Sequence, residues 1–247
     1  MLVKQIDVLL ALFELFRATL QPMTLTRLSE GLGQPKSSMS NIVETLRRRG
    51  YLYEVARRGG FYPSRRMFDL MREIVAADPI VERLHRHLLA LARDSGETAL
   101  LGAMDADSLI YLDVVESSQP IRYFAKSGER RPLYATSGGK AILASMAEAE
   151  RDALIARLDF SDRRPRTLAT GKALRADLAR GEARGWFTNL SEYTPDVTGV
   201  GVPLRAGGRL MALSLAGPNY RLEGRHEDIA RRLAKAARDI EAEERGS

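Results

Sequence analysis

The chain has 247 residues, of which 45% are hydrophobic and 28% are charged. This composition is that of an ordinary soluble globular protein, and the length allows one large domain or two modest ones. The sequence has no cysteine, which excludes disulfides, thiol catalysis and zinc–thiolate sites and fits a reducing cytoplasm. The densest apolar run, residues 8–16, is far shorter than the roughly 20 residues that span a bilayer. We therefore expect a cytoplasmic protein with no membrane partner.

The net charge of +6 is confined to the amino-terminal quarter of the chain. Residues 1–66 carry 11 Lys and Arg against 5 Asp and Glu, whereas residues 67–247 carry 27 basic and 27 acidic residues. A cationic segment joined to an electrically balanced remainder is typical of a protein whose first module binds a polyanion such as DNA.

Residues 4–20 predict a first helix that is apolar on almost every side, and Gln21-Pro22 ends it. One of its faces must cover a core. The opposite face is expected to meet a partner subunit, because an uncovered apolar helix face is costly in water.

Residues 24–62 predict a winged helix-turn-helix. Thr24 is a good N-cap for a short helix that ends at the glycines 31 and 33. A second helix follows, capped by Ser37 or Ser38, and Gly50 stops it. The apolar stripe of this helix consists of Met39, Ile42, Val43 and Leu46. Two short strands, 51–55 and 61–63, flank a turn with paired glycines, which suits a hairpin. In such a unit the second helix enters the DNA major groove.

The outward face of the second helix carries polar side chains that suit DNA. Asn can bond an adenine edge in two places, Ser and Lys reach bases or phosphates, and Glu can accept from cytosine. We expect DNA contacts from Lys36, Ser37, Ser38, Ser40, Asn41, Glu44 and Arg47 on the helix and from Arg57 and Arg58 on the wing. The alternative for the arginine run at 47–49 is a solvated helix end that complements the helix dipole.

Residues 64–77 predict a helix that links two domains, and Asp78-Pro79 marks the boundary. The expected division is a winged helix-turn-helix at 1–63, a linker helix at 64–77 and a second domain at 78–247. In the second domain we expect helices at 79–94, 138–146, 148–158, 173–184 and 224–244, and strands at 98–104, 109–116, 121–125, 186–189, 198–204 and 209–216. This order indicates an α+β fold with an antiparallel sheet and helices on one side.

The sequence lacks the motifs of common enzymes and metal sites. His85 and His87 face different directions on a helix, and His226 has no second histidine four residues later. Residues 138–140 lack the rest of a phosphate loop, and Gly199-x-Gly201 is not followed by a helix. We therefore expect no catalysis, no metal and no cofactor.

One stretch of the second domain is a candidate binding site. Ser137-Gly138-Gly139-Lys140 opens a helix, so free backbone N–H groups at its positive end form a natural seat for a carboxylate. The alternative is a close-packed turn, which composition alone favours.

Five segments occur in an order and spacing that are typical of one family. They read QPKSSMSNIVETLRRRGYL, GETALLGAMDADSLIYLDVVES, PLYATSGGKAILA, GWFTNLSEYTPDVTGVGVPL and GRLMALSLAGP. Over nearly its whole length the chain resembles the IclR-type bacterial transcriptional regulators. The resemblance implies a winged-helix DNA-binding domain, a linker helix and a GAF-like α+β effector domain. It also implies dimers or tetramers, joined largely through the DNA-binding domains and linker helices.

The resemblance further implies an effector pocket. The family's pocket positions fall on Ser137, Gly138, Asn189, Gly199, Ser214 and Ala216, and Met104, Tyr111 and Val197 are expected to line the walls. Asn189, Gly199 and Ala216 replace an acid, a Cys and a Ser of other members. We therefore expect a roomier, less polar pocket that suits an aromatic or alkyl carboxylate. Many members have Arg at the position of Asn41, so the operator sequence does not follow from the resemblance.

The sequence thus predicts a ligand-responsive, sequence-specific DNA-binding transcriptional regulator that represses a catabolic operon. Its expected partners are double-stranded operator DNA, a small organic acid effector and further copies of the chain in a homodimer or homotetramer. The ligand is expected to shift the linker helix and so the spacing of paired recognition helices. The alternatives are a ligand-independent architectural DNA-binding protein and a small-molecule-binding enzyme with a basic N-terminal domain.

Overall fold

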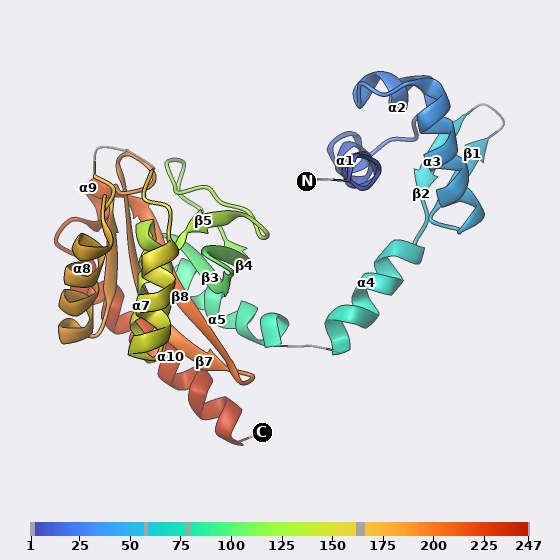
Figure 1. Cartoon of the computed structure of the whole chain (residues 1–247). Coiled ribbons are helices and arrows are strands. Elements are labelled where there is room, and N and C mark those ends of the chain that lie inside the picture. The colour runs from blue at the N-terminus through green and yellow to red at the C-terminus, as the bar shows by residue number, and fades with distance from the viewer. Residues whose placement is uncertain (1–2, 57–58, 78–79, 162–165, 247) are drawn as a thin grey trace. The chain divides into compact units, whose positions relative to one another are not determined.

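A computed structural model describes residues 3–56, 59–77, 80–161 and 166–246. The chain divides into two compact units, Met1–Asp78 and Pro79–Ser247 (Figure 1). Within the described ranges, every helix is too short or too polar to traverse a lipid bilayer.

The first unit is a winged helix-turn-helix followed by one further helix. Its elements are α1 (Lys4–Thr19), α2 (Leu25–Gly31), α3 (Lys36–Arg48), β1 (Leu52–Ala56), β2 (Gly60–Pro63) and α4 (Arg66–Ala77). The strands β1 and β2 pair antiparallel, and Met23 bridges to Phe61 of β2. Leu12, Leu28 and Met39, one from each of the first three helices, are fully buried together. The predicted fold of this region is confirmed.

Local chemistry explains where the elements of this unit begin. The Thr24 side chain accepts a hydrogen bond from the Arg27 amide, as the sequence predicts for an N-cap. The prediction of a serine cap on α3 is wrong. Pro35 is the N-cap, because its carbonyl accepts the first helical bond, from Met39, and the helix is already running at Lys36. At Gly60, φ is +94° and a Cβ would lie 2.7 Å from the Met23 carbonyl carbon, so only glycine fits there.

Two helices of this unit leave apolar side chains uncovered. On α1, Leu12 and Phe16 are buried, whereas Ile6 and Leu10 are 55% and 60% exposed. On α4, exposed large apolar side chains occur at Phe68, Leu70, Met71, Ile74 and Val75. These surfaces are the ones that a second subunit is expected to cover.

The second unit is built on an antiparallel sheet. Its helices are α5 (Ile80–Ser95), α6 (Ser137–Ala144), α7 (Glu148–Arg157), α8 (Gly171–Arg184), α9 (Asn219–Leu222) and α10 (His226–Gly246), with a 3₁₀ turn at Leu133–Ala135. Its strands are β3 (Thr98–Asp105), β4 (Ser108–Val115), β5 (Arg130–Pro132), β6 (Phe187–Leu190), β7 (Val197–Ala206) and β8 (Arg209–Pro218). In the described residues these strands form one sheet, in the order β5-β4-β3-β8-β7-β6.

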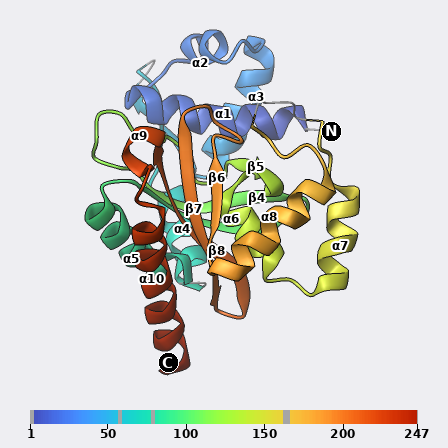
Figure 2. The same ribbon diagram turned by 90° about the vertical axis from the view of Figure 1, so that its left-hand side faces the viewer.

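Helices cover both faces of this sheet, so the expectation of helices on one side is wrong. Successive strand residues point to opposite faces. Leu101 and Leu213 pack in a core with α5 and α10, whereas Leu100 and Ala212 pack in a second core with α6, α7 and α8. Figure 2 shows the strands of this unit between these two groups of helices.

The expected strand at 121–125 is absent, and β5 takes the edge of the sheet beside β4 instead. Tyr123 and Ala125 are buried while Ile121 and Phe124 are exposed, so the segment keeps much of the alternating burial of a strand. Its backbone is held differently, because the Tyr123 carbonyl accepts from the Thr98 hydroxyl at 2.6 Å. The segment carries Tyr123 toward the start of β3.

Candidate ligand pocket and nucleic-acid interface

The polar face of α3 is available to a partner of the first unit. Lys36, Ser37, Ser38, Ser40, Asn41 and Arg47 are exposed, and Glu44 is partly exposed. Within the described residues, the side-chain amide of Asn41 has no hydrogen-bond partner, so it is free to bond a base edge. Arg57 and Arg58, which are expected to contact DNA from the wing, lie outside the described residues.

Glu44 lies in the middle of this face and is already paired. Its carboxylate accepts from Arg47 Nε at 2.8 Å and Nη2 at 3.0 Å, and from Arg48 Nε at 2.7 Å. The hydrogen bonds from Arg47 and Arg48 lower the pKa of Glu44 to about 2. These three bonds leave Glu44 about one free acceptor site for a cytosine.

The second unit has a small pocket between the N-terminus of α6 and the sheet. It is lined by Leu100, Leu109, Tyr111, Tyr123, Thr136, Ser137, Gly138, Asn189, Tyr193, Thr194, Val197, Gly199, Ser214 and Ala216. The cavity measures about 20 Å³, which is room for roughly one water molecule.

The structure brings together most of the residues that the sequence assigns to the effector pocket. Tyr111, Ser137, Gly138, Asn189, Val197, Gly199, Ser214 and Ala216 all line it. Met104 does not, and it is 38% exposed. Met104 is on the same sheet face as Leu100. It lies four residues further along β3, beside the turn to β4. Because each strand residue advances about 3.3 Å, this distance places Met104 outside the pocket.

The pocket is tight around its glycines. The backbone of α6 approaches β7 so closely that the glycines leave no gap. A Cβ on Gly199 would lie 2.9 Å from Ser137 Oγ, and one on Gly201 would lie 2.8 Å from the Ser137 carbonyl carbon. The small residues at these positions therefore coincide with close backbone contact and not with open space.

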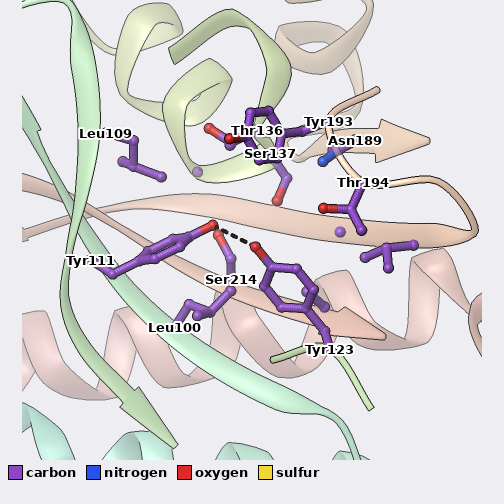
Figure 3. A pocket seen from close by; sticks show the side chains of 14 residues that line it. Leu100, Leu109, Tyr111, Tyr123, Thr136, Ser137, Asn189, Tyr193, Thr194 and Ser214 are labelled. Atoms are coloured by element: carbon purple, nitrogen blue, oxygen red, sulfur yellow. Dashed lines mark hydrogen bonds between the residues drawn. The ribbon is translucent and has the colours of Figure 1, made fainter. Parts of the chain in front are cut away.

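Hydroxyl groups and backbone N–H groups form the polar part of the pocket. Figure 3 shows the hydroxyls of Ser137, Ser214 and Tyr111 directed into the same space, with those of Tyr111 and Tyr123 3.4 Å apart. Burial raises the pKa of Tyr111, so its hydroxyl stays neutral. The Thr136 side chain accepts from the Gly139 amide, and helix geometry leaves the N–H groups of Ser137 and Gly138 without an acceptor in the helix.

Lys140 forms a buried ionic cluster beside the pocket, which the sequence did not predict. Its ammonium is 2.6 Å from Glu192 Oε1, 2.7 Å from Asp177 Oδ2 and 2.9 Å from the Thr188 carbonyl oxygen. Burial raises the pKa of Glu192, although the Lys140 charge opposes this. Glu192 precedes Tyr193 in the chain, and its amide donates to Asn189 Oδ1 at 2.8 Å. The ion pair between Lys140 and Glu192 therefore joins α6 to the segment that carries Tyr193.

The sequence also missed Tyr123, Tyr193 and Thr194 as pocket residues. Tyr193 and Thr194 lie in the sequence between two predicted pocket positions, Asn189 and Val197. This proximity could have predicted that they line the pocket. Tyr123 was assigned to a strand, and no local pattern places it opposite Tyr111.

Both units match family models. Residues 5–56 match the IclR helix-turn-helix domain, and residues 73–242 match the bacterial transcriptional regulator IclR C-terminal domain. The chain belongs to the IclR family. Among its IclR relatives, it is 26% identical over 203 residues to the HTH-type transcriptional regulator XynR of Escherichia coli, which covers 82% of this chain and 81% of XynR. It is 26% identical over 223 residues to the acetate operon repressor of Salmonella typhimurium, covering 88% and 81%.

Solved structures of IclR proteins share this fold. The Thermotoga maritima IclR has a TM-score of 0.81 at 21% identity, over 97% of this chain and 96% of that chain. An IclR homolog from Microbacterium hydrocarbonoxydans, complexed with 4-hydroxybenzoate, has a TM-score of 0.74 at 22% identity, over 98% and 100%. By its two family matches, this protein is a DNA-binding transcriptional regulator with an N-terminal helix-turn-helix domain.

Proposed function

We propose that the chain represses a catabolic operon and leaves its operator when a small organic acid, of aromatic character, occupies the pocket at the N-terminus of α6. The observation that carries the proposal is the convergence of the Ser137 and Gly138 N–H groups with the hydroxyls of Ser137, Ser214 and Tyr111 on one site. Donors at a helix N-terminus suit a carboxylate. The names of relatives support this reading, since one is an acetate operon repressor and another is complexed with 4-hydroxybenzoate.

In this proposal α3 is the recognition helix. Asn41 reads a base edge, while Lys36, Ser37, Ser38, Ser40 and Arg47 contact bases or phosphates and Arg57 and Arg58 reach the DNA from the wing. The exposed apolar faces of α1 and α4 support a homodimer or homotetramer. The division into a DNA-binding domain at 1–63, a linker helix at 64–77 and an effector-binding domain at 78–247 belongs to the same proposal.

The experiment is operator selection from random DNA, followed by fluorescence anisotropy on the selected site with and without benzoate and 4-hydroxybenzoate. We expect sequence-specific binding that an aromatic acid weakens by roughly tenfold, because allosteric coupling is typically about 1–3 kcal/mol. Asn41→Ala should relax preference at one base pair by about 1–3 kcal/mol. Enrichment of no sequence at all would favour an architectural DNA-binding protein and would contradict the proposal.

A further inference from the structure

The cavity can grow on only one side. On the side of α6 and β7, backbone packs on backbone, as the close approach of Gly201 to Ser137 and Gly138 shows. The rings of Tyr123 and Tyr193 close the pocket from segments that lie between strands, Tyr123 between β4 and β5 and Tyr193 between β6 and β7. An effector larger than the cavity of about 20 Å³ must therefore displace these tyrosines.

Arg131 of β5 supports both tyrosines from behind. Its guanidinium carbon lies 5.0 Å from the centroid of the Tyr193 ring. Burial lowers the pKa of Arg131, but the adjacent Tyr123 hydroxyl and the charge of Glu129 outweigh this and raise it. Arg131 is thus a fixed cation, and its side chain is only 19% exposed.

Not all donors of this guanidinium are used. The Nη2 group pairs with Glu129 and the Nη1 group donates to the Arg130 carbonyl, whereas Nε is buried and has no partner within the described residues. Displacement of Tyr123 and Tyr193 removes their contacts with a buried cation, which is costly unless another group replaces them. A carboxylate is the group that suits a guanidinium with free donors.

Arg131 does not line the pocket itself, but it contacts Tyr193, which does. The N-terminus of α6 and the guanidinium of Arg131 are thus two separate sites for anions, and Tyr193 contacts Arg131 from the pocket wall. We propose that the effector is a dicarboxylate, with one carboxylate at the N–H groups of Ser137 and Gly138 and the other on Arg131, and with its body in the space that the tyrosine rings vacate. This inference rests on the proposed organic-acid effector and narrows it to acids with two charges. Arg131 then selects the diacid over the matched monoacid.

The test is isothermal titration of the full-length protein with two matched pairs of acids, benzoate with terephthalate and hexanoate with adipate. We expect each diacid to bind at least about tenfold more tightly than its monoacid, as one charge-assisted bidentate hydrogen bond provides. Arg131→Gln should remove this preference, so that each diacid binds no more tightly than its monoacid. Arg130→Gln is the matched control, because the neighbouring Arg130 is more exposed and pairs with Asp105.

A second variant keeps the test decisive if Arg131→Gln does not fold. Tyr123→Phe removes the hydroxyl beside Arg131, so displacement becomes easier and the diacid should bind as tightly as to the wild type or more tightly. Monoacids that bind while diacids bind no better would overturn the dicarboxylate and leave the organic-acid effector standing. Binding of none of the four acids would overturn both. An unchanged diacid preference in Arg131→Gln would overturn the role of Arg131.

Discussion

At the scale of single residues, Glu44 pairs with two arginines of α3, the proposed recognition helix. Its carboxylate holds Arg47 and Arg48 along α3 and adds a negative charge where DNA phosphates would approach. We predict that Glu44→Gln raises the affinity for arbitrary DNA by several fold and lowers the ratio of specific to non-specific affinity, because the freed arginines bind phosphates of any sequence. Anisotropy on selected and scrambled duplexes measures both quantities.

The matched control is Glu30→Gln on α2. Glu30 is also exposed and belongs to the same unit, so the variant makes the same change in net charge without freeing an arginine of α3. Equal gains in non-specific affinity for the two variants would mean that net charge, and not the arginine pairing, governs the effect.

At the scale of elements, α6 and the strands β7 and β8 form the rigid wall of the pocket. We predict that Gly201→Ala destabilises the protein by about 1–3 kcal/mol, the usual cost of overpacking, because the added Cβ would lie 2.8–2.9 Å from Ser137, Gly138 and Ser214. Denaturant unfolding followed by circular dichroism measures this. Gly246→Ala, where a Cβ meets nothing within 4 Å, should leave stability almost unchanged, and similar costs for both variants would contradict the close packing.

The same elements show what the sequence could and could not predict. Periodicity and caps located α1 to α3 and most helices and strands of the second unit, because those signals are local. The alternation around Tyr123 correctly indicated burial, but burial against the start of β3 leaves the same pattern as burial within a strand. The size of the pocket depends on how closely Gly199 and Gly201 bring β7 to α6. The sequence shows that these two positions lack a side chain, but it does not show the distance between β7 and α6.

At the scale of the whole molecule, the excess of positive charge in residues 1–66 predicts which charges control DNA affinity. Removal of one lysine that neutralises a phosphate should reduce the slope of log K against log salt by about 0.9. We predict this reduction for Lys36→Gln, since Lys36 is exposed at the first position of α3. Lys172→Gln changes an exposed lysine at the second position of α8 in the electrically balanced remainder, so its slope should equal that of the wild type. Binding isotherms between about 50 and 200 mM salt separate these outcomes. An equal reduction of slope for both lysines would show that the balanced part of the chain also binds DNA and would contradict this prediction.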